Sequence, residues 1–403
     1  TREPSPTSTP TTSRTPTPPA TPAPSSLPEA VPYNLGETTI VQSDFPEDSR
    51  FRNMPVRLEG VIAVPESQDR HPVVLILHGS HPACPSDQWP CAPEREQQNY
   101  MGFGYLVSEL AARGYVALAI NVNAEHTFGF GETISGERTQ QLVFLHLDAL
   151  RAAGEDGSNA FGVDLTGRVD LERMVWIGHS RGAGSANQMI RDLGLDTPEG
   201  ASRAGFGPVA GLLQIAPAFT LVNYLPLADL SVASILPACD GDLLTVEGQA
   251  YYESARLDAN RQHLTTAVLL LGANHNHFNT VLKPDRIIEE ERPDCVGADQ
   301  LSAEAQRAFL VHYAADYLIT LFGQPADVLA AVHRLGVDPD TRPPGELYGY
   351  PVRVSLVRPA AERRVLIIPQ SEDELAHNLQ GGVVTLEGVE AVYCRQGYYT
   401  PVT

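Results

Sequence analysis

The sequence predicts an α/β protein with a mostly parallel central sheet and helices on both of its faces. Two observations support this fold class. From about residue 33 to residue 323, apolar strand-like runs alternate with helical segments, which is the pattern of strands joined by crossover helices. Several of these runs are continuously apolar, as expected of strands that are buried on both faces.

The elements follow one another in a regular order. Residues 38–43 and 56–64 alternate with period two, which is typical of an antiparallel pair of strands. The run "HPVVLILHGS" at 71–80 indicates a central strand. The elements expected after it are a helix at 101–115, a strand at 116–123, helix 136–154, strand 173–180, helix 181–194, strands 209–218 and 231–238, helix 248–258, strand 265–275 and helix 302–323.

Both ends of the chain differ from this main domain, which we place at 33–323. The first thirty residues hold nine prolines, eight threonines and five serines, so we expect 1–32 to be an extended, disordered linker. We expect 324–403 to form a short helix at 326–336 and a small β-rich appendage. The appendage should have strands at 351–359, 362–370 and 381–394.

The charge and the linker restrict the partners and the compartment. Asp and Glu outnumber Lys and Arg by 49 to 28, a net charge of −21, so a nucleic acid would be repelled. No apolar run approaches the ~20 residues that span a bilayer. The linker and the absence of an initial Met lead us to expect a secreted or extracellular monomer. A signal or lipoprotein segment would have been removed, and the linker could serve as a surface tether.

The cysteines fit an oxidising compartment. Cys84 and Cys91 share one short loop and are expected to form a disulfide, as are Cys239 and Cys295, which leaves Cys394 over. Because no pair has CxxC spacing, we expect no zinc site.

The segment "VWIGHSRGAG" at 175–184 places Ser180 between two glycines, at the end of an apolar strand and the start of a helix. Gly178 and Gly182 let neighbouring backbones pass close to the turn. A G-x-S-x-G sequence in this context presents a serine hydroxyl on a sharp turn. Ser180 is therefore the candidate nucleophile.

Other segments supply the groups that a nucleophilic serine needs. His275, just past an apolar strand, is the candidate general base, and His277 is the less favoured neighbour. Read as a metal pair, these two histidines lack further ligands. Asp240 and Asp242 follow the penultimate strand and are candidates for the acid that orients the base. The backbone N–H groups of Ser80 and Arg181 are expected to form the oxyanion hole.

The motifs "HGS", "GHSRG", "ACDGD" and "GANH" resemble, in order and spacing, those of the α/β-hydrolase superfamily. Within it they are similar to the branch of cutinases, polyester hydrolases and dienelactone-hydrolase-like enzymes, and "GHSRG" also resembles chlorophyllases. The resemblance covers 33–323. It implies an α/β-hydrolase fold, Ser180 as nucleophile, His275 as base, an aspartate after the penultimate strand and no cofactor. Arg181 departs from the small or apolar residue common at its position in polyester hydrolases.

The same resemblance guides the choice of the acid. In polyester hydrolases the strand gives way to a small residue and the acid comes four positions later. Ala238 in the small position selects Asp242, which we prefer. A strand that ends at Pro237, followed by a three-residue step, would select Asp240 instead.

The segment 219–230 is too short for the helical cap of lipases, so we expect no large cap and an open cleft. Trp89, Asn123, His179 and Phe219 are the residues expected to line it, although Trp89 could instead pack against the neighbouring disulfide.

Together these features predict a secreted serine hydrolase that cleaves carboxylic esters, including bulky or polymeric esters such as polyesters, through an acyl-enzyme. A peptidase or acyltransferase on the same triad, or a non-catalytic surface-binding protein, are the alternatives.

Overall fold

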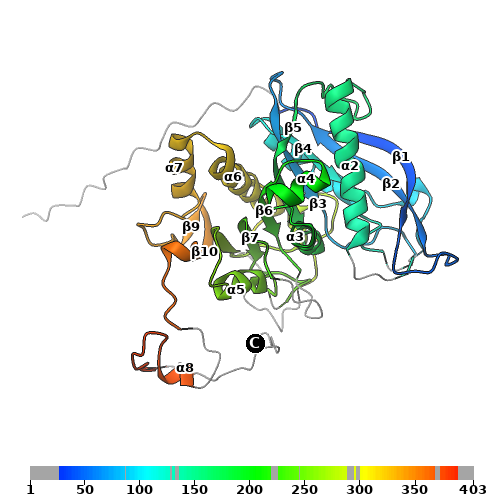
Figure 1. The fold of residues 1–403 in the computed structure, drawn as a ribbon. Coiled ribbons are helices and arrows are strands. Elements are labelled where there is room, and N and C mark those ends of the chain that lie inside the picture. Colours follow the sequence, from blue (N-terminus) through cyan, green and yellow to red (C-terminus); the bar gives the residue numbers. More distant parts are fainter. Residues whose placement is uncertain are drawn as a thin grey trace, which may run out of the picture.

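One mixed, mostly parallel sheet with helices on both faces makes up the body of the protein (Figure 1). The structure is a computed structural model. It describes residues 27–86, 88–127, 129–131, 136–218, 226–244, 246–287, 295, 300–367 and 373–388. Most of the predicted linker, together with Phe219 and Cys394, lies outside the described residues.

The sheet has ten strands in the order β1-β2-β4-β3-β5-β6-β7-β8-β10-β9. The neighbours from β4 to β8 are parallel, and the strands at both edges are antiparallel. The strands are β1 Val31–Val41, β2 Asn53–Ala63, β3 His71–Leu77, β4 Val116–Ile120, β5 Val169–His179, β6 Val209–Ile215, β7 Ser231–Pro237, β8 Thr265–Leu270, β9 Glu346–Leu347 and β10 Tyr350–Val357. Every residue of β3 and β4 is buried, as their continuously apolar sequences predict.

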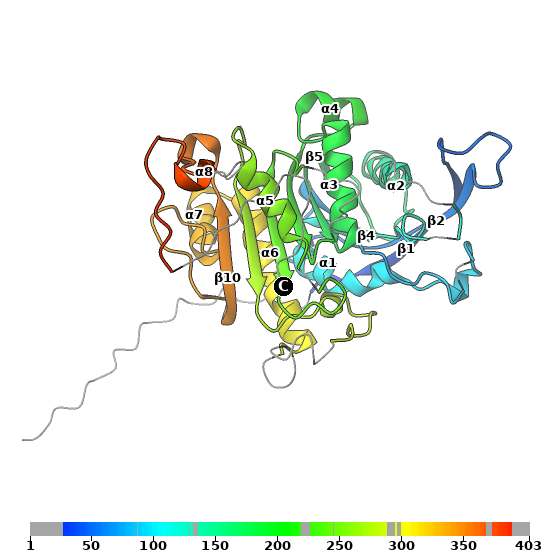
Figure 2. The same cartoon turned by 90° about the horizontal axis from the view of Figure 1, so that it is seen from below.

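Helices cover the two faces of the sheet and create two apolar cores (Figures 1 and 2). The helices are α1 Gly104–Ala111, α2 Glu137–Asp156, α3 Arg181–Leu193, α4 Pro198–Ala204, α5 Gln249–Leu257, α6 Ala303–Phe322, α7 Pro325–Arg334 and α8 Asp373–Ala376. Short 3₁₀ turns are η1 Pro93–Arg95, η2 Asn99–Phe103, η4 Asn276–Phe278 and η6 Ala360–Glu362. Helices α2, α3 and α5 pack on one face, and α1 and α6 pack on the other.

The predicted α/β class with a mostly parallel sheet is confirmed, and the strands and helices expected between 33 and 323 are present. Two details differ. The helix expected at 101–115 is shorter, because its first part is the 3₁₀ turn η2. Helix α4 was not predicted; its seven residues begin with the cap of Thr197, whose side chain accepts a hydrogen bond from Gly200 N.

The described part of the C-terminal region, where a small β-rich appendage was expected, adjoins the main sheet. Strand β10 pairs antiparallel with β8 and so continues the main sheet. Asp316 of α6 binds Arg334 of α7 and accepts a hydrogen bond from Tyr348, which joins these segments to the main body. The structure describes no strand within 362–367 or 381–388 beyond a single bridge between His377 and Val383.

Two further predictions concern the compartment. The cysteine pairs Cys84–Cys91 and Cys239–Cys295 lie at disulfide-bonding distance, as predicted. Within the described ranges, no helix is both long enough and apolar enough to cross a membrane.

Candidate active site

The candidate residues meet where the parallel strands of the sheet end. We call this side the carboxyl edge, to distinguish it from the outer strands β1 and β9. Gly79 and Ser80 follow β3, Ser180 follows β5, Asp240 follows β7 and His275 follows β8. Because these strands run parallel, their carboxyl ends lie on the same side. This edge is where open α/β sheets generally bind ligands.

Ser180 occupies a sharp turn between β5 and α3. Its backbone has φ 55° and ψ −126°, a region that residues with a side chain adopt only at a cost in free energy. Hydrogen bonds hold the turn on both sides, because Ser180 N donates to Ile215 O at 2.8 Å and Ser180 O accepts from Ala183 N at 3.1 Å. The surrounding chain thus imposes the unusual conformation on the serine.

Glycines allow the end of β3 to lie against this turn. A Cβ on Gly79 would lie 2.5 Å from the Cβ of Ser180, and a Cβ on Gly182 would lie 2.5 Å from the carbonyl oxygen of His78. Real Cβ atoms do not approach other heavy atoms so closely. The glycine in "HGS" and the second glycine in "GHSRG" are therefore needed for the same close contact.

His275 is the histidine that pairs with an aspartate at this edge. Its ring Nδ1 lies 2.8 Å from Oδ2 of Asp240, and both side chains are buried. A carboxylate can only accept, so Nδ1 carries the hydrogen and, in the neutral ring, Nε2 carries the lone pair. Among the described residues His277 forms no ion pair with an aspartate, and its pKa is lowered by partial burial.

The choice between the two aspartates favours Asp240, not the preferred Asp242. Hydrogen bonds alongside β8 continue past the end of β7, since Ala238 N donates to Leu270 O at 2.9 Å and Cys239 N to Ala273 O at 2.8 Å. Asp240 therefore comes first after the paired segment and points at His275. The carboxylate of Asp242 is 56% exposed and lies 3.6 Å from Nε2, on the opposite side of the ring from Nδ1.

Asp240 also fixes its own turn. Its Oδ1 accepts hydrogen bonds from Asp242 N at 2.9 Å and from Leu243 N at 2.6 Å. From the sequence we expected Asp240 to hold the turn and Asp242 to contact His275. In the structure the carboxylate of Asp240 makes hydrogen bonds of both kinds.

Three carboxylates act on the charge of His275. Burial by itself lowers the pKa of His275, but the hydrogen bond to Asp240 and the negative charges of Asp240, Asp242 and Asp285 outweigh burial and raise the pKa above 6.5. The site therefore favours the imidazolium form of this histidine.

Asp285 is a residue that sequence reasoning missed. Its carboxylate accepts a hydrogen bond from Gly241 N in the loop of Asp240 and one from Asn276 N, at 3.1 Å, in the loop of His275. Burial raises the pKa of Asp285. This residue joins the two loops that carry Asp240 and His275. Its position in an irregular segment with no motif gave no signal in the sequence.

His78 is a second residue that was missed, although it belongs to "HGS". Its Nε2 accepts from Val122 N at 3.0 Å, so its hydrogen is on Nδ1, which donates to Gly79 O at 2.8 Å. In a trans peptide the C=O and the following N–H point in opposite directions. The bond to Gly79 O therefore directs the N–H of Ser80 away from His78.

The two predicted oxyanion donors both adjoin the serine turn. Ser80 follows Gly79, which contacts Ser180, and Arg181 is the first residue of α3. A helix N-terminus favours negative charge because its first N–H groups point outward and the helix dipole is positive there.

Several histidines near the serine turn have lowered pKa values. His179 donates from Nε2 to the backbone oxygen of His275 at 3.1 Å, and the two rings lie 5.0 Å apart. His81 stacks on His179 with ring centroids 5.5 Å apart. Burial lowers the pKa of His81 to about 3 and that of His126 and His179 well below 6.5. These rings therefore stay uncharged at neutral pH.

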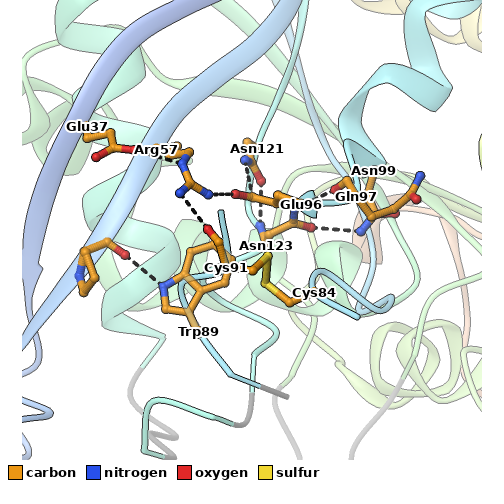
Figure 3. The surroundings of a disulfide bond; sticks show 11 residues. Glu37, Arg57, Cys84, Trp89, Cys91, Glu96, Gln97, Asn99, Asn121 and Asn123 are labelled. Carbon is orange, nitrogen blue, oxygen red and sulfur yellow. Dashed lines mark hydrogen bonds and ion pairs between the residues drawn. A yellow bond between two sulfur atoms is a disulfide. The ribbon is translucent and has the colours of Figure 1, made fainter. Parts of the chain in front are cut away.

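Three of the residues expected to line an open cleft lie within the described ranges, and all three are buried. Trp89 donates to Pro55 O at 2.8 Å beside the Cys84–Cys91 disulfide, and Asn123 bonds to Glu96 at 2.9 Å (Figure 3). His179 is fully buried against His275. Phe219 lies outside the described residues.

Ser180 and His275 follow parallel strands at the same end of the sheet, but no hydrogen bond joins them among the described residues. Within the described part of the chain, Nε2 of His275 has no hydrogen-bond partner, and Ser180 is 3% exposed. Hydrogen bonds between a nucleophile and its base are often long in a substrate-free protein and tighten when substrate binds.

A search of the described residues finds no group of three or more His, Cys, Asp or Glu side chains that could hold a metal ion. No family model matches the chain, and no curated protein matches it.

Proposed function

We propose that the chain is a serine hydrolase of the α/β-hydrolase superfamily that cleaves carboxylic esters through an acyl-enzyme. The observation that supports it most is the pair of Asp240 and His275 at the same sheet edge as Ser180, a serine with a positive φ. A positive φ on a residue other than glycine is frequent at functional sites. Because the acid must bind Nδ1 of the base, we give this role to Asp240 in place of Asp242.

In the proposed reaction the Ser180 oxygen attacks the ester carbonyl carbon while its proton passes to Nε2 of His275. The N–H groups of Ser80 and Arg181 stabilise the negative charge on the carbonyl oxygen. The C–O bond of the ester then breaks, and the leaving alkoxide takes the proton from Nε2. Water, activated in turn by His275, releases the acid and restores Ser180.

The substrate is proposed only as a class. Two disulfides are compatible with a secreted or extracellular protein, in which case polymeric esters, including polyesters, are natural substrates to test. A p-nitrophenyl ester series of increasing acyl length, with a solid polyester alongside, measures the preference.

Labelling and substitution test the proposed chemistry. A serine-reactive fluorophosphonate should label Ser180, and Ser180→Ala should lose about 10⁶-fold in kcat on p-nitrophenyl acetate. His275→Ala should lose a comparable factor. His277→Ala is the matched control, because it removes a histidine two residues away that forms no ion pair with an aspartate among the described residues.

Two results would overturn the proposal: no hydrolysis of any ester by the wild-type protein, or labelling at a serine other than Ser180. Faster cleavage of a p-nitroanilide peptide than of the matched ester would favour the peptidase, and transfer of the acyl group to an alcohol in preference to water would favour the acyltransferase.

A further inference from the structure

We propose, as an inference that rests on the function above, that Asp242 sets the charge preference of the enzyme for the leaving group of its ester. Its carboxylate favours leaving groups that carry a positive charge and disfavours those that carry a negative charge. Asp242 is thus a specificity-determining residue beside the reaction and is separate from the acid Asp240.

The position of the carboxylate is fixed by its backbone. Asp240 Oδ1 accepts from the N–H of Asp242 at 2.9 Å, which holds the turn. The Asp242 side chain then extends from the turn, 56% exposed, with Oδ2 3.6 Å from Nε2 of His275. An exposed carboxylate has no need of this histidine for its solvation, so its approach to the reacting nitrogen calls for an explanation.

The chemistry places the leaving group near this carboxylate. Nε2 must hand its proton to the leaving oxygen, which requires the two atoms to be ~3 Å apart. Since Oδ2 of Asp242 lies 3.6 Å from Nε2, the leaving oxygen lies within ~7 Å of the carboxylate. A charge carried next to that oxygen is therefore within the range of strong Coulomb interaction.

The charges around this side of the site do not cancel Asp242. The other charged groups that act on His275 are Asp240 and Asp285, which are also carboxylates. Lys283 and Arg286 are exposed on the following loop, and neither forms an ion pair with Asp242 among the described residues. His81 and His179 are neutral because burial lowers their pKa.

The positive charge of Arg181, which follows Ser180 in the sequence, acts on the side of the site opposite to Asp242. Arg181 influences Glu125 and His126, which follow β4. In the sheet β4 lies on one side of β5, and β7 and β8, which lead to Asp242 and His275, lie on the other. The site is therefore acidic on the side of the base, from which the leaving group is protonated.

Three acetate esters of similar size test the inference by release of acid at pH 8. Acetylcholine has a cationic leaving group, 3,3-dimethylbutyl acetate is its neutral isostere, and 2-acetoxyethanesulfonate is anionic. The wild-type kcat/KM should be roughly three- to tenfold higher for the cation than for the neutral ester, and lower by a similar factor for the anion. Added salt should reduce both differences.

Variants separate Asp242 from the net charge of the protein. Asp242→Asn should bring the three kcat/KM values together while the neutral ester is still hydrolysed, and Asp242→Lys should reverse the order. Glu66→Gln is the matched control: it removes one exposed negative charge in the turn before β3, at the opposite edge of the sheet. This control should keep the wild-type ratios.

The outcomes distinguish this inference from the proposed function. If the wild-type protein hydrolyses none of the esters, the proposed function fails, and the inference fails with it. If the neutral ester is hydrolysed but Asp242→Asn keeps the wild-type ratios, only the inference is overturned. Loss of all three activities in Asp242→Asn, with activity retained in Asp240→Asn, would make Asp242 the acid and would also overturn it.

Discussion

At the scale of single residues, the candidate site depends on how two neighbouring aspartates divide their contacts. Asp240 is buried and bonds both to His275 and to the backbone of its own turn. Asp242 is exposed and reaches the other ring nitrogen without a hydrogen bond. Only the first arrangement can hold the hydrogen of the neutral ring on Nδ1.

The first prediction follows from this division. Asp240→Asn should reduce kcat by up to ~10⁴-fold, because an amide that presents its N–H₂ group to Nδ1 holds the wrong tautomer of His275. Its remaining oxygen can still accept from the turn, so we expect the protein to stay folded. Asp242→Asn should keep most of the turnover of a neutral ester.

Measurement of kcat and Tm for both variants checks this prediction. A folded Asp240→Asn protein with normal turnover, beside an inactive Asp242→Asn protein, would restore the assignment preferred from the sequence.

At the scale of elements, most of the arrangement could be predicted because the strands that carry the site are continuously apolar. The runs that became β3 and β5 gave the positions of Gly79 and Ser180 directly, since each site residue comes at the end of a buried run. The sequence also predicted that glycines at the serine turn allow backbones to pass close together, and the structure has such contacts at Gly79 and Gly182.

What could not be predicted depends on pairing between distant segments. The end of β7 was ambiguous because its partner, β8, determines how far the pairing continues past Pro237. His78 and Asp285 act through bonds to backbone groups of other loops, which leave no pattern in the sequence. The prediction of strands at 362–370 and 381–394 was wrong for 362–367 and 381–388, the parts that the structure describes. Apolar, β-branched sequence favours a strand, but it does not supply a partner strand to pair with.

The second prediction concerns the loop that contains Glu96, which a buried ion pair with Arg57 joins to β2. Glu96 binds Arg57 and accepts hydrogen bonds from Asn121 and Asn123, both at 2.9 Å (Figure 3). Glu96→Ala should destabilise the protein by ~3–5 kcal/mol, because it leaves the guanidinium of Arg57 buried without its main partner.

Chemical denaturation measures this loss, and the same arginine provides its control. Glu37 binds Arg57 at 3.0 Å from a side chain that is 70% exposed, so Glu37→Ala should cost less than ~1 kcal/mol. Equal losses in the two variants would contradict the role given to burial.

The third prediction compares the two disulfides. The pair Cys239–Cys295 closes 56 residues and Cys84–Cys91 closes 7, so replacing the first pair by serine should cost about 2 kcal/mol more stability than replacing the second. Because Asp240 directly follows Cys239, loss of the first pair should also lower kcat. Free thiols at Cys239 and Cys295 in the oxidised wild-type protein would exclude this prediction.

At the scale of the whole molecule, the fourth prediction is that stability falls in mild acid. Burial lowers the pKa strongly at five histidines, which are His78, His81, His126, His146 and His179, and less strongly at His277. Below pH 6.5 the unfolded chain binds protons at these positions and the folded chain does not. Each histidine therefore removes about 1.4 kcal/mol per pH unit until the pH reaches its folded-state pKa. His275 acts in the opposite direction, because its raised pKa favours the protonated folded state.

Urea unfolding between pH 7.5 and 5.5 tests the prediction. His146 lies in α2, where its Nδ1 bonds to Tyr33. His146→Gln should therefore reduce the slope of unfolding free energy against pH by about 1.4 kcal/mol per pH unit, the contribution of one proton. A free energy of unfolding that is constant over this range would contradict the sum of the five contributions.

The positive φ of Ser180 has a consequence that needs no substrate to observe. A glycine would occupy φ 55°, ψ −126° without the steric cost that a Cβ brings, so Ser180→Gly should be more stable than Ser180→Ala by ~1 kcal/mol or more. Comparison of the two melting curves isolates that cost, because both variants lack the hydroxyl. If the glycine variant also melts above the wild type, the serine lowers stability at this position and must have been kept for another reason. Calorimetry would then indicate that Ser180 has a function before any reaction has been found for it.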